Sequence, residues 1–255
     1  DRGLLGRYGC FVGRLARGDL GESLRSRRPV ATLIGERAVA SAQLAGAALA
    51  LQLATALPLA AWAARRRTWL VELGLTVGHS VPAFVLGPLL IYLVGFELGW
   101  LPLGGHGGGG LDRVRHLALP AITLALATLP ASVRLLRDQL TAQLAADHVR
   151  AARARGVSAR AVVWRHALRP ALRPWLAFQG VELGALVGGA IVVEAAFAWP
   201  GLGRETMLAV RDLDLPVLLG VTLVSALAVT SANALADALA WWLDPRADDR
   251  EASAR

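Results

Sequence analysis

A polar, strongly basic stretch lies at residues 147–158, which read DHVRAARARGVS, and continues to WRHALRP at residues 164–170. Nine arginines stand between positions 134 and 173, against two acids, Asp138 and Asp147, so this segment carries a net charge of +7. The whole chain carries +8. Long apolar runs flank the segment on both sides, and a basic segment in that setting is typical of a membrane border.

The local pattern of this basic segment is helix, stop, helix. Residues 135–155 are rich in Ala, Leu, Gln and Arg, which favour a helix. Gly156 can take the left-handed conformation that ends a helix, and Ser158 can cap the next one. The pattern therefore predicts two short helices joined by an elbow at residues 156–158. By composition alone, a basic amphipathic loop lying on anionic lipid headgroups fits the segment equally well.

The composition of the chain points to a membrane protein and excludes several other classes. Hydrophobic residues make up 55% of the 255 residues, and the mean hydropathy is +0.48. Nucleic-acid binding is not indicated, because the arginines lie between apolar runs without interleaved aromatic residues. All 27 basic residues are arginine, which excludes a Walker A lysine. With one cysteine, Cys10, and no zinc or nucleophile motif, we expect no disulfide, metal, cofactor or covalent catalysis.

Five apolar runs predict an all-α, polytopic membrane helix bundle, because each is long enough to cross a hydrocarbon core about 30 Å thick. The expected spans are residues 40–64, 74–98, 117–135, 175–199 and 217–243. They form one transmembrane domain over residues 40–246, with residues 136–174 as its large cytoplasmic loop. Residues 1–39 form an extracytoplasmic or interfacial segment, and residues 247–255 form a polar cytoplasmic tail.

The distribution of arginine predicts the orientation of the bundle. Placing the basic segment inside gives the cytoplasmic loops 12 arginines, whereas the loops at residues 99–116 and 200–216 hold 4. The C-terminus is then cytoplasmic, and residues 1–39, with eight arginines, lie outside against the rule. One further span upstream would restore the rule. Since the chain begins with Asp1, we expect it to be preceded by such a span.

Two motifs carry a family resemblance. Arg150, Ala151 and Ala152, followed after three intervening residues by Gly156, resemble the EAA-x-x-x-G loop of ABC importer permeases, with Arg in place of Glu. The fuller phrase is similar to that of the dipeptide, oligopeptide and nickel permease family. The run FAWPGLGR at residues 197–204, preceded by Glu194, resembles the phrase that closes the fifth span of peptide-type permeases. Apart from the resemblance, that run indicates only an interfacial Trp199 and a Pro-Gly turn.

The resemblance implies a non-catalytic permease subunit of a type I ABC importer in a bacterial-type inner membrane, for di- or oligopeptides or related solutes such as nickel chelates. It implies that the basic loop docks on an ATPase, with a coupling set of Arg150, Ala151, Ala152, Gly156, Ser158, Arg165 and Leu168. The implied partners are a second homologous permease, two ABC ATPase subunits and an extracytoplasmic solute-binding protein. Membrane lipid surrounds the bundle, and no nucleic acid is expected.

Glu182 and Asp237 are ionisable residues inside apolar runs, where a charge costs about 2.5–3.5 kcal/mol, so both should face protein or water. Gly180, Gly184 and Gly188 recur every four residues and predict a smooth face for close helix contact, within the chain or with a second permease. Glu182 lies about 200° around the helix from Gly180, so we expect it to line a translocation path. A protonated or internally paired carboxylate is the alternative.

Two other readings of the same residues stay open. In a self-sufficient secondary transporter or channel, Glu182 and Asp237 would carry protons or cations. Asp237 also lies near the cytoplasmic end, where it could extend to the interface. A membrane anchor with a lipid-binding loop is the third reading. His79, in the second run, has no second ligand at helical spacing, and we expect it to be a hydrogen-bonded packing residue rather than a metal ligand.

Overall fold

The computed structural model describes residues 9, 13–15, 17–65 and 69–243, except for the side chains of residues 185–189 and 243. The described part of the chain is helical and contains no strand, which confirms the predicted all-α class. Its elements are α2 (Val30–Arg65), α3 (Trp69–Ser80), α4 (Ala83–Leu90), η1 (Ile91–Glu97), α5 (Gly110–Ala145), α6 (Asp147–Ala154), α7 (Ala159–Ala161), η2 (Val162–Ala167), α8 (Leu168–Ala196), α9 (Leu202–Arg211) and α10 (Leu215–Leu243).

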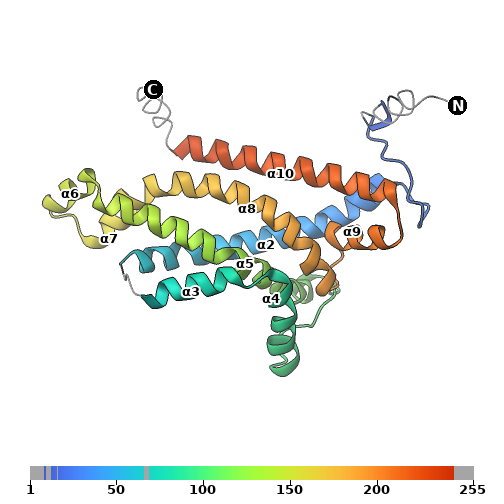
Figure 1. The fold of residues 1–255 in the computed structure, drawn as a ribbon, viewed down its shortest axis with the longest axis horizontal. Coiled ribbons are helices and arrows are strands. Elements are labelled where there is room, and N and C mark those ends of the chain that lie inside the picture. The colour runs from blue at the N-terminus through green and yellow to red at the C-terminus, as the bar shows by residue number, and fades with distance from the viewer. Residues whose placement is uncertain (1–8, 10–12, 16, 66–68, 244–255) are drawn as a thin grey trace.

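The long helices α2, α5, α8 and α10 run side by side along the long axis of the molecule (Figure 1). At one end lie α6 and α7, and at the other end lies the short helix α9 (Figure 1). Among the described residues, α2, α5 and α10 are long and apolar enough to cross a membrane. The expected spans at residues 40–64, 117–135 and 217–243 lie within these three helices, and most of the span expected at residues 175–199 lies within α8.

The run at residues 74–98 is not one straight helix, as the sequence analysis assumed. α3 ends at Ser80, and α4 with η1 continues at 94° to it. Pro82 explains the break, since it has no N–H for the helix ladder and disfavours helical geometry at Val81. The bent pair counts as a fourth span only if both halves cross together. Figure 1 shows α4 turning away from the bundle axis below α3.

The helices α2 and α5 are longer than the membrane is thick. Each has 36 residues, which corresponds to about 54 Å, against a hydrocarbon core of about 30 Å. Pro120 and Pro130 lie inside α5 without ending it. The last turns of α5 therefore belong to the basic region, where its side chains pack beneath α6 and η2.

The predicted glycine face packs inside the chain. A Cβ atom added to Gly180 would lie 2.9 Å from Cβ of Ala236, and one added to Gly184 would lie 3.4 Å from Cγ1 of Val229. Both neighbours belong to α10, so close contact between α8 and α10 needs these glycines. The third member of the pattern, Gly188, falls in the segment whose side chains lie outside the described residues.

A buried polar chain joins three helices at the centre of the bundle. Gln179 of α8 donates from Nε2 to Oε1 of Gln52 in α2, at 3.1 Å. Ser132 of α5 donates from Oγ to Oε1 of Gln179, and Trp175 donates from Nε1 to Ser132 Oγ at 2.9 Å. All four side chains are buried. Such groups are costly to bury without partners, so the chain of bonds fixes how α2, α5 and α8 pack.

Candidate functional site

The elbow of the basic segment has the geometry that its sequence predicts. Gly156 has φ = +80°, and its N–H donates to the carbonyl of Arg153 at 2.9 Å. The Val157 N–H donates to the carbonyl of Ala152 at 3.2 Å, so the two bonds together form a Schellman motif that ends α6. Ser158 then caps α7, accepting a hydrogen bond from Ala161 N at 3.4 Å. We name residues 147–167 the basic hairpin.

One boundary differs from the prediction. Residues 135–155 were expected to form one helix, but α5 ends at Ala145 and α6 begins at Asp147, with Ala146 extended at φ −70° and ψ 153°. Asp147 in the first turn favours a helix start, because its charge complements the helix dipole. The break also places Val149 in the apolar cluster that contains Leu136 and Leu140 of α5, and Ala152 is buried as well.

The basic hairpin has an apolar inner face and a charged outer face. Val149, Ala152, Val162, Val163 and Ala167 are buried. The exposed residues are Asp147, His148, Arg150, Ala151, Arg153, Ala154, Arg155, Gly156, Ser158, Ala159, Arg160, Trp164 and Arg165. The hairpin is therefore held to the bundle by apolar contacts and presents its arginines and Trp164 outward.

The structure divides the predicted coupling set between these two faces. Arg150, Ala151, Gly156, Ser158 and Arg165 lie on the exposed face. Ala152 is buried beneath them, and Leu168 is half-buried where α8 begins. A Cβ atom added to Gly156 would meet no atom within 4 Å, so within this chain only backbone strain opposes a side chain there.

The two ionisable residues predicted for the membrane lie in different surroundings. Glu182 of α8 is half-buried and close enough to His79 of α3 to interact with it electrostatically. Asp237 of α10 is exposed. Within the described residues no hydrogen bond or ion pair joins Glu182 to Asp237, so the structure does not bring them into one site. His79 is exposed and forms no hydrogen bond in that part of the chain, so the expected packing role is not seen.

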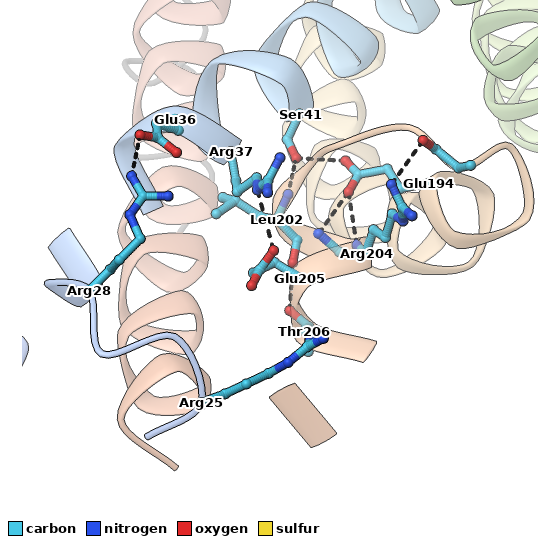
Figure 2. A network of polar contacts seen from close by, with 12 residues as sticks. Arg25, Arg28, Glu36, Arg37, Ser41, Glu194, Leu202, Arg204, Glu205 and Thr206 are labelled. Atoms are coloured by element: carbon cyan, nitrogen blue, oxygen red, sulfur yellow. Dashed lines mark hydrogen bonds and ion pairs between the residues drawn. The ribbon is translucent and has the colours of Figure 1, made fainter. Parts of the chain in front are cut away.

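Sequence reasoning gave no role to Glu194, which the structure places at the centre of a network at the opposite end of the bundle (Figure 2). Its side chain is 0% exposed. The carboxylate accepts hydrogen bonds from Ser41 Oγ at 2.6 Å, Gly203 N at 2.7 Å and Arg204 N at 3.1 Å. Glu194 therefore caps the N-terminus of α9 and ties it to α2. The spacing from an acid in an apolar run to the following Pro-Gly-x-Gly was the available signal.

The run at residues 197–204 builds the turn that this network requires. A Cβ atom on Gly201 would overlap the Glu194 carboxylate, and one on Gly203 would overlap Cα of Ile191. Trp199 is 0% exposed and donates from Nε1 to the carbonyl of Ala40 at 2.9 Å. The reading of Trp199 as an interfacial residue is therefore wrong, because its ring fills the core between α2 and α8.

One ion pair joins the segment before α2 to the turn after α9, and another joins α2 to α9. Arg25 pairs with Asp212 at 2.7 Å, and Arg37 pairs with Glu205 at 3.3 Å (Figure 2 shows the second pair). Asp214 is 3% exposed and accepts from Ser23 Oγ at 2.6 Å. Burial alone would raise the pKa of Asp214, but the hydrogen bonds from Ser23 and from backbone N–H groups outweigh it and hold that pKa below its ordinary value.

Comparisons with known proteins agree with this arrangement. The family model described as "Binding-protein-dependent transport system inner membrane component" matches residues 56–249. The chain is 34% identical over 250 residues to the oligopeptide transport system permease protein AppB of Bacillus subtilis (strain 168), covering 94% of this chain and 79% of that protein. It is 36% identical over 252 residues to the glutathione transport system permease protein GsiC of Escherichia coli (strain K12), covering 96% and 80%.

A solved structure supports the fold. The crystal structure of an amino acid ABC transporter with histidines matches with a TM-score of 0.59 and 16% identity, over 82% of this chain and 93% of that one. At that identity the likeness concerns the arrangement of helices alone. The family match, the two relatives and the helical membrane bundle lead to one conclusion: the chain belongs to the family of binding-protein-dependent transport system inner membrane components and is a permease subunit of an ABC importer.

Proposed function

We propose that this permease forms half of a translocation path for di- or oligopeptides or related solutes such as nickel chelates, and that an ATPase drives it through the basic hairpin. The observation that carries the proposal is the hairpin itself. Its apolar face is buried in the bundle, its elbow is fixed at Gly156, and its arginines and Trp164 are exposed together. Arginine and tryptophan are the residues most enriched at the energetic centres of protein interfaces.

The proposed partners follow from the family and from the proposal that one permease forms only half of the path. The family description names a binding-protein-dependent system, and hydrolysis of ATP belongs to separate subunits. We propose two ATPase subunits at the basic hairpin, a solute-binding protein at the end that carries α9, and a second homologous permease beside this one in the lipid. The peptide class of solute is supported by relatives named for oligopeptide and glutathione transport.

The proposed orientation places the basic hairpin and the C-terminus in the cytoplasm. The excess of arginine in the loops of that end supports it, since such loops stay on the cytoplasmic side. Exposed tryptophans near the ends of α2, α3 and α10, among them Trp62, Trp69 and Trp242, suit interfacial anchors at the same level. A reporter that is active only outside the cytoplasm should be inactive when it is fused after Arg255. Activity of that fusion would contradict the proposed orientation.

The test of coupling is purification of the chain in mild detergent from its native membrane. An ATP-binding subunit should co-purify with the wild-type chain and be lost when Arg153, Arg155 and Arg160 are all changed to Glu. The matched control changes Arg17, Arg27 and Arg115 to Glu, which should leave the ATP-binding subunit attached, because these exposed arginines lie outside the basic hairpin and form no ion pair within the described residues. Solute uptake by this chain alone, with no ATPase present, would contradict the proposal and favour the self-sufficient transporter.

A further inference from the structure

One flank of α3 is polar although the helix lies in an apolar run. Glu72, Thr76 and His79 fall within about 60° of one another around the helix, because successive residues are 100° apart. All three are exposed, as is Ser80 at the end of the helix. On the far side, Val77 lies about 200° from His79 and is 54% exposed. The helix thus has a polar flank and an apolar flank.

Neighbouring helices extend this polar flank. Arg137 of α5 forms an ion pair with Glu72, and Arg134 donates from Nη2 to Thr76 Oγ1 at 2.9 Å. Glu182 of α8 extends this set of polar residues beyond α3 and α5, because it interacts electrostatically with His79. Polar groups therefore follow one another from the basic end of the bundle inward, and hydrocarbon is an unfavourable surrounding for every one of them.

The bend after Ser80 is a second indication that this region faces water or protein rather than lipid. Between α3 and α4 the chain turns by 94°, which leaves the last carbonyls of α3 without helical partners. Broken helices of this kind occur in membranes where they line a water-filled cavity or are buried in protein. The broken end, His79, Ser80 and Glu182 all lie in this one region.

Glu182 differs from Glu194 and Glu97 in what it has left to bind. Glu194 accepts three hydrogen bonds from the protein, and Glu97 accepts one from Tyr92. Within the described residues the Glu182 carboxylate accepts none. Gly180 holds the opposite face of α8 against α10, which turns Glu182 towards α3. A carboxylate so placed attracts a cation, and an ammonium group is the cation that peptides carry.

We propose that Glu182, with His79 and Ser80 beside it, forms a site in the translocation path that attracts the ammonium group of a passing solute. This inference rests on the proposed function, because it requires that the polar flank of α3 face the path. It adds the class of chemical group that the path selects and the helix flank that lines it.

The test measures the attraction directly with two thiol reagents of opposite charge. Ser80→Cys is introduced into a chain that carries Cys10→Ser, and the assembled transporter is treated with 2-(trimethylammonium)ethyl methanethiosulfonate or with 2-sulfonatoethyl methanethiosulfonate. The introduced thiol should react with both reagents, and faster with the cation. Adding Glu182→Gln should lower the ratio of the two rates by roughly fivefold or more, since the negative charge proposed to attract the cationic reagent is removed. Glu182→Asp should keep the ratio.

The matched control is Leu227→Cys in α10, a helix on the other side of the bundle from α3 (Figure 1); Leu227 is 59% exposed, and its thiol should react with neither reagent. Failure of the thiol at position 80 to react, an unchanged ratio in Glu182→Gln, or equal reaction at position 227 would each overturn the inference. Stimulated ATP hydrolysis is measured in the same preparation. If it is present while the ratio does not change, only this inference fails; if no ATPase is attached, the proposed function fails.

Discussion

The two ends of the bundle use their polar residues in opposite ways. At the α9 end, Glu194, Asp214, Arg25 and Arg37 bind groups of the same chain. At the basic hairpin, Asp147 pairs with Arg150 at 3.2 Å, but the exposed arginines far outnumber the acids. The charged residues of the α9 end are paired within the chain, whereas most arginines of the basic hairpin are exposed and can bind a partner. Stability should therefore depend on the first end, and coupling on the second.

The largest effect on stability is expected at Glu194. Glu194→Ala would leave the Ser41 hydroxyl and the N–H groups of Gly203 and Arg204 without their acceptor in a buried site. We expect the free energy of unfolding to fall by roughly 3–5 kcal/mol. Thermal unfolding in detergent would measure it.

Glu194→Gln is the control for this change, because the amide keeps an oxygen for the two N–H groups and fills the same volume. Its loss of stability should be clearly smaller than that of the alanine variant. Equal melting temperatures for Glu194→Ala and wild type would show that the network does not hold the α9 end together.

The next largest effect is expected at Gly156 in the basic hairpin, where a substitution should impair coupling more than stability. Gly156→Val forces a β-branched residue to φ = +80°, at a cost of about 1–2 kcal/mol, and should distort the elbow. We expect the variant to insert into the membrane but to lose most of the ATP hydrolysis that transport stimulates. ATPase activity of the reconstituted complex is the measurement.

Gly156→Asn sharpens this result, because asparagine tolerates the left-handed conformation and space within the chain is open. If the shape of the elbow is what matters, the asparagine variant keeps its stimulated ATPase activity. If both variants lose it, the partner leaves no room for a side chain. If Gly156→Val kept the full stimulation of ATP hydrolysis, the shape of the elbow would not be required for coupling.

The elbow was predictable from sequence, whereas the α9 end was not, and the reason is physical. Gly156 and Ser158 act on the backbone within a few residues of themselves, so their effect can be inferred locally. The role of Glu194 depends on Ser41, which lies 153 residues away. The break at Ala146 likewise depends on where the apolar side chains of α6 can be buried. Pro82 was visible, but whether a proline bends or breaks a span depends on the helices around it.

A smaller effect should appear as a pH dependence at Asp214. Its pKa is lower in the folded chain than in the unfolded one, so its contribution to stability is present above the unfolded value of about 3.9 and is lost as pH falls through the folded value. Asp214→Asn should therefore lower the melting temperature at pH 7 and have less effect near pH 3. If the difference in melting temperature between wild type and Asp214→Asn were the same at pH 7 and pH 3, the lowered pKa of Asp214 would be contradicted.

The smallest effect on stability is expected at Arg150, on the other end. Its pair with Asp147 is exposed on both sides, with side-chain exposures of 70% and 96%, and such pairs contribute about 0–1 kcal/mol. Arg150→Ala should therefore melt within a degree or two of wild type, since about 1 kcal/mol shifts the midpoint of a domain this large by only a few degrees. Its affinity for the ATP-binding subunit should nevertheless fall, because the arginine lies on the exposed face of the basic hairpin. A variant that loses stability but keeps that affinity would place Arg150 with the residues that hold the bundle together, and would erase the contrast between the two ends.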